Sequence, residues 1–545
     1  MIESLKQEGS IVAGTRPSRL ANIQSPGRML VAGLALGVLA DLLVLGEPSG
    51  IGLLILVLVV VGAWWGLARL EGVPAVLTNL WLLLPLFFLA SMVFVRANAT
   101  LTTLNTLAVL CLLAYLLFFW GRGRVHNLGL VDMALLPLRV GGNAVTLTPP
   151  MVAESVDMEM VQRHGRRHLF PVLRGLLLAA PILLVFTVLL AMADAIFAHT
   201  VESAFSLNIF VYLFNWTGHA VAVGLVAWLV SGALAYGVVR RYGRDDQSQF
   251  EATLQHTPQY FSLGYVETTT LLIAVNLLFL VFVAIQFTYL FGGITYLQLE
   301  NFSYSEYARR GFFELLVVAI LSVSLILSLN WLTRRESKRQ IKLFNGLGTL
   351  LIGFVLVMLA SAFRRMELYE ATFGYTELRL LVYAFIIWLG IVLVWFVYTL
   401  WRRPERLAIG VLLAALGFLV TLNLINPDAF IARQNLARYA VIGNLDAVYL
   451  ASLSDDALPQ LIQALSLTKG DQEEQLMPSC ADPYSRVSRT DCYAVPYEII
   501  SEELNGRLHS MTENTKWRQW PSFHLARWQA FTRLQQWANA GDFGD

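Results

Sequence analysis

Charged side chains are scarce in this sequence. Only 14% of its 545 residues are Asp, Glu, Lys or Arg, whereas soluble proteins carry roughly 25%. The 39 basic and 38 acidic residues leave a formal net charge of +1, so the basic excess that is typical of nucleic-acid-binding proteins is missing. These two shortages argue against a soluble domain and predict no nucleic-acid partner.

Motifs for catalysis and for metal binding are missing as well. The sequence contains no G-x-S-x-G element and no P-loop. His164 and His168 have the spacing of a zinc-protease helix, but Gly165 stands where that motif has Glu. The sequence therefore predicts no catalytic residue, no metal site and no cofactor, and it favours a protein that is not an enzyme.

Long apolar runs are abundant, and 57% of the residues are hydrophobic. A membrane span needs about 20 mostly apolar residues, and its backbone groups must bond within the segment, which predicts helices. The predicted fold class is all-α, a polytopic transmembrane helical bundle of eleven spans with a small, mainly helical extracytoplasmic C-terminal domain. The predicted spans are 29–46, 51–70, 75–95, 101–120, 171–195, 215–239, 265–290, 311–333, 346–363, 379–400 and 406–425.

The distribution of Lys and Arg predicts the orientation, because these residues concentrate in cytoplasmic loops. With the N-terminus in the cytoplasm, the inner segments carry 23 of them and the outer loops carry 6, while the other 10 follow residue 425. An odd number of spans then places the C-terminus outside. The predicted topology is a cytoplasmic N-terminus and an extracytoplasmic C-terminus.

The chain divides into five predicted parts. Gly141-Gly142 and Pro149-Pro150 act as helix breakers and predict a loop around them. The parts are a cytoplasmic N-terminal segment (1–28), a four-helix transmembrane block (29–120), a cytoplasmic loop (121–170), a seven-helix transmembrane block (171–425) and the extracytoplasmic C-terminal domain (426–545).

The C-terminal domain opens with two predicted helices. Leu436–Leu453 has an amphipathic pattern, and Ser454 is placed to cap a second helix over Asp455–Leu465. Near the end of the chain, Trp528 and Trp537 share one helical face. This face predicts a helix that packs on the rest of the domain or on the membrane surface; a sugar-stacking platform is the alternative.

Two of the three cysteines lie in this predicted outer domain. Cys480 and Cys492 are close in sequence, and an oxidising compartment permits a disulfide between them. Closing so short a loop contributes roughly 3 kcal/mol in the chain-entropy model. No histidine lies nearby with ligand spacing, so we predict a disulfide rather than a metal pair.

The outer ends of the eighth to tenth predicted spans carry five arginines and five glutamates. One interpretation is an ion-pair network that joins these helices; the other is a polar site for an anionic headgroup or solute. Arginine suits both, because its planar guanidinium binds carboxylate and phosphate in a bidentate manner. The residues are Arg309, Arg310, Arg364, Arg365 and Arg379 with Glu306, Glu314, Glu367, Glu370 and Glu377.

Other polar residues lie within the predicted spans. They are Asp41, Asp194, His219, Glu267, Asn276 and Gln286. The three carboxylates are near span ends and are expected to reach water, whereas Asn276 is expected to bond to a neighbouring helix. Gly33 and Gly37 predict a face for close helix packing.

Several polar motifs between the apolar runs carry a family resemblance. They are DLLVLGEPSG (41–50), APILLVF (180–186), ADAIF (193–197), NLLFLVFVAIQ (276–286), YLFGG (289–293), YARRGFFEL (307–315), RRMELY (364–369), FGYTELR (373–379) and NPDAFIAR (426–433). Over about residues 30–465 the chain resembles a family of bacterial multi-pass membrane proteins that is defined only as a domain of unknown function. The resemblance implies a bacterial cytoplasmic membrane protein and supplies no substrate.

Three functions remain as hypotheses. The first is a non-enzymatic envelope scaffold or sensor. The second is a transporter or flippase for an anionic solute or lipid, and the third is an intramembrane transferase on lipid-linked substrates with Glu377 or Asp194 as base. Membrane lipids are the expected partners, and a protein partner or a small anionic ligand is left open. A water-filled cavity among the polar residues would favour the last two.

Overall fold

A computed structural model describes residues 23, 25–45, 50–121, 123–155, 208–242, 264–291, 312–333, 337–469, 475–476 and 493–540, and most of these are helical. The apolar helices, in chain order, are α1 (Pro26–Ala40), which continues as a π-helical turn over Asp41–Leu45, α2 (Gly52–Leu70), α3 (Leu83–Val95), which follows a 3-10 turn over Leu77–Leu82, α4 (Ala99–Phe119), α5 (Leu130–Ser155), α9 (Asn208–Tyr242), α11 (Tyr265–Phe291), α13 (Phe312–Leu332), α14 (Lys338–Phe373), α15 (Glu377–Trp401) and α16 (Leu407–Ile425).

Ten helices of the described chain are long and apolar enough to cross a membrane, and α13 contains a shorter apolar stretch, Val317–Leu332. Nine of the ten coincide with predicted spans, and the tenth, Leu130–Val152, does not. The protein is therefore a multi-pass membrane protein. The predicted span at 171–195 lies outside the described residues.

Helix α5 occupies much of the stretch that the sequence predicts to be a cytoplasmic loop, 121–170. It contains Pro137, Pro149 and Pro150, which explains the prediction, because proline removes a backbone hydrogen bond inside a helix. If α5 crosses the membrane, residue 152 lies on the other side from residue 130. The Lys and Arg residues between α5 and the next span would then lie outside, and they could not be counted among the 23 predicted for the cytoplasmic side.

A tyrosine of α4 satisfies the carbonyl that the first proline leaves free. Pro137 has no N–H for the carbonyl of Met133, four residues earlier. The hydroxyl of Tyr115 donates to that carbonyl oxygen at 2.6 Å. Tyr115 and Met133 are each 5% exposed, so this bond replaces one that water cannot supply.

A tryptophan of α9 does the same for the second proline. Pro149 leaves the carbonyl of Val145 free, and the indole N–H of Trp228 donates to it at 3.1 Å. The hydroxyl of Thr148 donates in turn to the carbonyl oxygen of Trp228 at 2.8 Å. Side chains of neighbouring helices thus satisfy the carbonyls that Pro137 and Pro149 leave free in α5.

Replacing Tyr115 by phenylalanine is expected to lower the free energy of unfolding by about 1–3 kcal/mol, because it leaves the buried Met133 carbonyl without a donor. The measurement is equilibrium unfolding of the purified protein in mixed micelles. Tyr398→Phe is the control, because Tyr398 is 46% exposed and its change is expected to stay within about 0.5 kcal/mol. Equal losses in the two variants would contradict this role of Tyr115.

Close packing joins α1 to α9. A Cβ atom on Gly33 would lie 2.8 Å from the carbonyl oxygen of Ala227, and one on Gly37 would lie 2.7 Å from the carbonyl oxygen of Val223. The close-packing face predicted for these glycines is confirmed. Because the later glycine meets the earlier residue of α9, the two helices run antiparallel. Helix α9, which the sequence groups with the later spans, packs here on the first ones.

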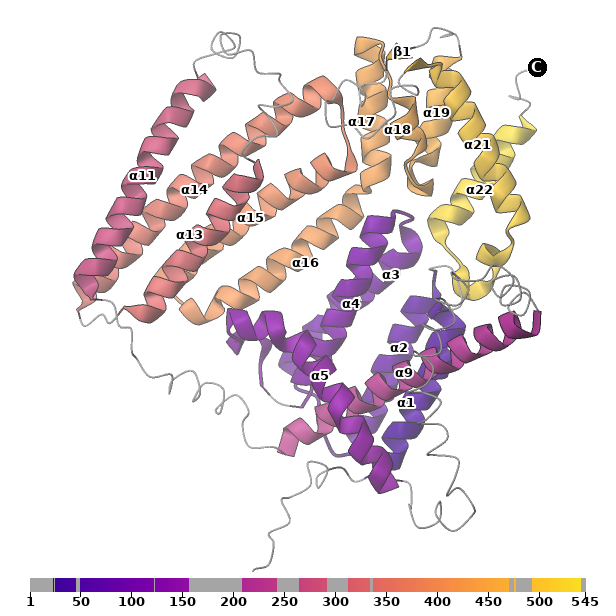
Figure 1. Cartoon of the computed structure of the whole chain (residues 1–545), viewed down its shortest axis with the longest axis horizontal. Coiled ribbons are helices and arrows are strands. Elements are labelled where there is room, and N and C mark those ends of the chain that lie inside the picture. Colours follow the sequence, from indigo (N-terminus) through magenta and orange to yellow (C-terminus); the bar gives the residue numbers. More distant parts are fainter. Residues whose placement is uncertain are drawn as a thin grey trace, which may run out of the picture.

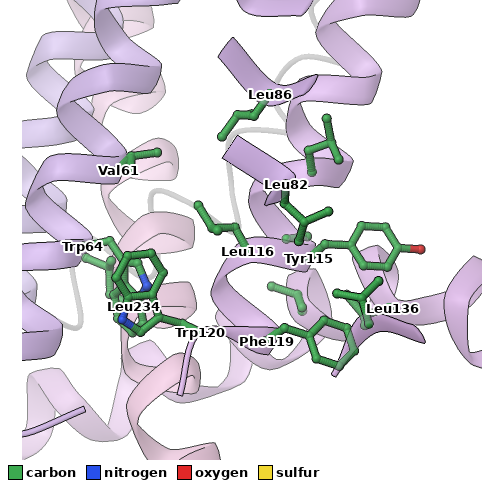
Figure 2. Packing of buried hydrophobic residues seen from close by; sticks show 14 of the residues in the cluster. Val61, Trp64, Leu82, Leu86, Tyr115, Leu116, Phe119, Trp120, Leu136 and Leu234 are labelled. Atoms are coloured by element: carbon green, nitrogen blue, oxygen red, sulfur yellow. The ribbon is translucent and has the colours of Figure 1, made fainter. Parts of the chain in front are cut away.

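Two apolar cores hold the membrane helices together. In the larger one, Trp64 and Trp120 pack edge to face with ring centroids 6.1 Å apart, and Leu234 of α9 lies beside them (Figure 2). The second core is formed by α11, α13, α14 and α15. Helix α16 lies between the two groups (Figure 1), with Leu416 in the first core and Leu407 in the second.

The described residues between 427 and 540, which we call the C-terminal domain, pack around a separate core that also includes Leu380 of α15. Its elements are α17 (Pro427–Ile442), α18 (Ala447–Ala451), a 3-10 turn over Asp455–Ala457, α19 (Leu458–Thr468), the paired strands β1 (Gln475–Leu476) and β2 (Tyr493–Ala494), α21 (Pro496–Glu513), 3-10 turns over Lys516–Arg518 and Trp520–Ser522, and α22 (Leu525–Asn539). The single helix predicted over 436–453 is wrong: the chain breaks at Gly443, whose φ of +75° is left-handed. The predicted cap is confirmed, because Ser454 Oγ accepts from the Asp456 N–H at 3.4 Å.

The tryptophan-rich end contributes to this core in part. Trp517 and Trp537 are buried in it, whereas Trp528 is 51% exposed. The buried face of α22 consists of Ala530, Leu534 and Trp537. Packing on the rest of the domain is therefore confirmed for Trp537; Trp528 does not pack there, and its packing on the membrane surface stays a prediction.

The start of the chain and the C-terminal domain contact opposite ends of α2. Ser25 Oγ donates to Oε1 of Glu71, directly after α2, at 2.6 Å. At the other end of α2, a Cβ atom on Gly52 would lie 3.1 Å from the carbonyl oxygen of Pro521 in the C-terminal domain. We call this second end of the helical bundle the junction end.

Candidate functional site at the junction with the C-terminal domain

The predicted cluster of arginines and glutamates is described only in part. Outside the description lie Arg309, Arg310, Glu306 and the side chain of Glu314. Arg364 pairs with Glu367 within α14, and their side chains are 68% and 51% exposed, so this pair contributes at most about 0.5 kcal/mol. Arg379 is buried and donates to the carbonyl oxygen of Gly374. The network between three helix ends stays a prediction.

Two of the predicted intramembrane polar residues join helices. Asn276 Nδ2 donates to the carbonyl oxygen of Leu347 in α14 at 3.2 Å, which confirms the predicted bond to a neighbouring helix. Asp41 Oδ1 lies 2.7 Å from Nδ1 of His219, so Asp41 contacts a histidine of α9; its expected access to water stays a prediction. Each of these two contacts joins a pair of neighbouring helices.

The remaining predicted residues do not form a common site. Glu267 accepts from the Gly264 N–H at 2.9 Å and so caps the start of α11. Gln286 is buried at 6% exposure in α11. Asp194, Cys480 and Cys492 lie outside the described residues, and the disulfide stays a prediction.

The structure brings together a polar cluster that the sequence does not predict. It consists of Arg96, Asn98, Glu377, Asp428 and Asp456, and we call it the junction cluster. It lies where the turn between α3 and α4 meets the start of α15 and the C-terminal domain. Asn98, Asp428 and Asp456 are each at most 9% exposed, so their polar atoms need protein partners.

Asn98 is the centre of this cluster. Its Nδ2 donates to Oε1 of Glu377 at 3.1 Å and to Oδ1 of Asp428 at 3.0 Å. Its Oδ1 accepts from the Leu101 N–H at 2.9 Å and caps α4. Oδ2 of Asp428 accepts from the Ser454 N–H at 3.1 Å. One amide side chain therefore connects α4, α15 and the C-terminal domain.

Asp456 supplies the acceptors that the short turn needs. Its Oδ2 accepts from the N–H groups of Ala97 at 2.6 Å and Asn98 at 3.3 Å. Arg96 Nη1 lies 3.9 Å from Asp456 Oδ1, and Arg96 Nε donates to the carbonyl oxygen of Asn423 at 2.9 Å. The turn thus depends on the C-terminal domain for hydrogen bonds that it cannot form alone.

Two further contacts join the C-terminal domain to the residue that precedes α2 and to the α3–α4 turn. The Ile51 N–H donates to the carbonyl oxygen of Phe523 at 2.9 Å. Nε2 of His524 lies 3.1 Å from the carbonyl oxygen of Arg96, and its Nδ1 accepts from the Arg527 N–H at 3.5 Å. These roles fit the neutral histidine that carries its proton on Nε2.

Burial shifts the pKa values of both groups that contact the turn. Burial raises the pKa of Asp456 to about 6; the turn amides and Arg96 act in the opposite direction, and Asp428 adds to the rise. Burial, followed by the charge of Arg527, lowers the pKa of His524 to about 4. The junction therefore brings the protonation of Asp456 closer to neutral pH than in a free aspartate, and it favours a neutral histidine.

A cavity of about 490 Å³ adjoins the cluster, and its lining includes Arg96, Arg433, Arg533, Asp455 and Asp456. A second hollow, on α14 and α15, is lined mainly by apolar side chains. The described residues contain no group of His, Cys, Asp and Glu that could hold a metal ion. The arrangement at the junction is suited to binding an anionic group and to transmitting movement between the domain and the helices.

Sequence reasoning missed this site because its bonds link distant residues. Asn98 and Asp428 are 330 positions apart, and no local pattern connects them. Two signals were present: Asn98 stands between two apolar runs at a cap position, and Asp428 belongs to the polar motif NPDAFIAR. Neither signal gives the partner.

The comparisons agree with the resemblance of the sequence motifs. A family model described as "Domain of unknown function (DUF4153)" matches residues 83–464. No curated protein matches the chain, and no solved structure matches it. The family match includes the α3–α4 turn, Glu377, Asp428 and Asp456, and it ends before α21 and α22. Because it covers more than half of the chain, this protein belongs to that family of unknown function.

Proposed function

We propose that this membrane protein is a sensor of the bacterial cytoplasmic membrane. In this proposal the N-terminus is cytoplasmic, and the C-terminal domain lies outside and passes its state to the membrane helices. The observation that carries the proposal is the bonding of Asn98 to Glu377 and Asp428 at once. The family resemblance supports the cytoplasmic membrane, and the contacts of the two chain ends with opposite ends of α2 support opposite sides.

The junction cluster is suited to transmission rather than to static attachment. Directional hydrogen bonds at the turn and at Glu377 tie the domain to both groups of helices, because α3 and α4 belong to the first core and α15 to the second. A change of position in the domain must break or move these bonds. A coupling claim requires an element that both sites influence, and the α3–α4 turn is the candidate.

The two alternatives receive less support. Glu377, the candidate base of a transferase, accepts from Asn98, and its N–H donates to the hydroxyl of Tyr449 at 2.8 Å, so it is held within the junction. A transporter requires a polar path among the intramembrane residues. Asp41 and Asn276 are instead occupied by contacts between helices.

Reporter fusions test the proposed topology. A fusion after Ile425 is expected to be active with an extracytoplasmic reporter and inactive with a cytoplasmic one, because the Lys and Arg residues at the opposite end of the bundle retain that end inside. A fusion at the start of α1 should show the reverse. A cytoplasmic reporter that is active after Ile425 would rule out the topology.

Hydrogen exchange on the full-length protein in lipid nanodiscs tests transmission. Asn98→Ala is expected to speed amide exchange about tenfold or more in α21. If the protein is a sensor, exchange also rises at the far end of the bundle, in the turn that contains Arg402 and Arg403. Asn143→Ala is the matched control, because among the residues that the structure describes the Asn143 amide bonds within its own helix alone, to the carbonyl of Arg139 at 2.8 Å.

The same experiment separates a sensor from a scaffold. A rise confined to the junction and to the C-terminal domain would refute transmission and would favour a static attachment. A rise at the far end with the control variant as well would show general loosening, which also contradicts the proposal.

A further inference from the structure

The cavity beside the junction cluster lies at the level where two membrane spans end. Val95 and Ile425 line it, and they are the last residues of the candidate spans Leu77–Val95 and Pro404–Ile425. Its other walls come from α17, α19 and α22 of the C-terminal domain. A ligand here touches the bundle and the domain at once. The volume of about 490 Å³ lies within the usual range for small-molecule sites.

Three arginines from three segments line this one cavity. Arg96 belongs to the α3–α4 turn, Arg433 to α17 and Arg533 to α22. Arg96 is engaged with Asp456 and with a backbone carbonyl. Arg433 uses its Nε for the carbonyl oxygen of Ala429 in its own helix, at 3.2 Å, which leaves the rest of its guanidinium for a ligand. Within the described chain, Arg533 has no ion pair.

The acidic residues of the cavity already have partners. Asp455 lies 3.6 Å from both Arg507 and Arg527. Asp456 accepts from the amides of the α3–α4 turn. Repulsion of an anion by these two carboxylates is therefore reduced, whereas two of the lining arginines keep donors available. This imbalance favours an anionic ligand.

Two amide oxygens in the lining point to a ligand that also donates hydrogen bonds. Asn426 Oδ1 and Gln460 Oε1 are buried and have no partner within the described chain. The orientation of Asn426 is supported by its Nδ2, which lies 3.5 Å from Oδ1 of Asp456. A buried acceptor without a donor is costly, and a small rotation that brings each oxygen to the cavity surface would let hydroxyl groups on a ligand satisfy both.

We infer that this cavity binds a phosphate group that carries neighbouring hydroxyls. Several guanidinium groups fit the oxygens of one phosphate, because each can donate two parallel hydrogen bonds. Such a group occurs in the glycerol phosphate headgroup of a membrane lipid and in a soluble polyol phosphate. This inference rests on the proposed function in one respect: the ligand would be the input of the sensor. Binding of the ligand is measured alone, without a readout of transmission.

The test uses the full-length protein purified in detergent. Native mass spectrometry compares retention of phosphatidylglycerol with that of phosphatidylcholine, offered in equal amounts. The wild type is expected to retain phosphatidylglycerol preferentially, and Arg433→Gln/Arg533→Gln should weaken its binding about tenfold or more. Arg364→Gln/Arg518→Gln is the matched control, because both residues lie outside the cavity lining, and it should bind as the wild type does.

A second arm identifies the source of the phosphate. Titration calorimetry with glycerol phosphate and with inorganic phosphate shows whether the soluble group binds with the same dependence on Arg433 and Arg533. If it does, the site recognises a soluble phosphate; if only the lipid binds, the tail contributes. Either result supports the cavity as the site. Size-exclusion profiles confirm folding, and Arg433→Lys/Arg533→Lys, which keeps the charge but not the planar fork, should bind with intermediate affinity.

Two results would overturn the inference. One is a wild type that shows neither a preference for phosphatidylglycerol nor binding of soluble phosphate. The other is an equal loss in the Arg433/Arg533 variant and in the Arg364/Arg518 control. Both leave the exchange experiment on Asn98→Ala untouched, so failure of the ligand and failure of the sensor can be told apart.

Discussion

Replacing Gly37 by leucine is expected to separate α1 from α9 and to abolish most of the folded protein. A Cβ atom alone at Gly37 would lie 2.7 Å from the carbonyl oxygen of Val223 and 3.0 Å from the backbone nitrogen of Ala227. These are backbone atoms, so no rotamer change relieves the clash, and the helices must move apart. Overpacking typically costs about 1–3 kcal/mol and more where backbone must shift.

The measurement is the fraction of monodisperse protein after purification, followed by its thermal unfolding midpoint. Gly66→Leu in α2 is the matched control, because a Cβ atom at Gly66 would meet nothing within 4 Å. Gly37→Ala should lie between the wild type and Gly37→Leu. Normal yield and stability of Gly37→Leu would show that α1 and α9 do not pack as the structure has them.

The second large effect concerns pH at the junction. In the folded protein the pKa of Asp456 is raised from 3.8 to about 6. The folded state then binds the proton more tightly than the unfolded state, so this group stabilises folding at low pH and loses that contribution as pH rises from about 4 to 6. A shift of about two units corresponds to about 3 kcal/mol as an order of magnitude.

His524 acts in the opposite direction. Its pKa is lowered from 6.5 to about 4, so the unfolded state binds the proton more tightly. Its contribution to stability is complete above pH 6.5 and is lost as pH falls toward 4, again about 3 kcal/mol as an order of magnitude. The two windows overlap, and the wild type should therefore show little net dependence from these two groups between about pH 4 and 6.

Single variants should expose each half of this balance. Asp456→Asn is expected to lose stability on acidification from pH 6.5 to 4, because only the histidine effect remains. His524→Gln is expected to gain stability over the same range. The measurement is the unfolding free energy of the full-length protein at several pH values. His509→Gln is the control, since the His509 side chain is 74% exposed, and it should follow the wild type. Slopes of the same sign in the two junction variants would contradict the assignment.

Local chemistry explains which parts of the fold the sequence predicts. The length of an apolar run decides whether it can span a bilayer, and nine candidate spans follow from that alone. The spacing of Gly33 and Gly37 predicts close packing, and the hydroxyl of Ser454 predicts a cap. In each case the sequence signal lies within a few residues, although the surface against which Gly33 and Gly37 pack, on α9, is distant in the chain.

The parts that the sequence does not predict depend on distant partners. The prolines of α5 indicate a loop until Tyr115 and Trp228 are known to supply donors for the freed carbonyls. The junction cluster was missed for the same reason. The sequence drew attention to the arginines and glutamates because they are numerous, yet the described cluster is organised by one asparagine, Asn98.

The contact between His524 and the α3–α4 turn also has a consequence for how the protein is made. The two partners are separated by 428 residues, and synthesis at about 5–20 residues per second takes roughly 20 to 90 s to cover that distance. For most of this interval the turn also lacks Asp456, the acceptor for the Ala97 amide, which follows 359 residues later, and for all of it the turn lacks the imidazole that meets the Arg96 carbonyl. A ribosome that stalls just before α22 leaves a chain whose turn can bond to Asp456 but still lacks its contact with His524. The missing contact at the Arg96 carbonyl distinguishes an unfinished chain from a finished one at this side of the membrane.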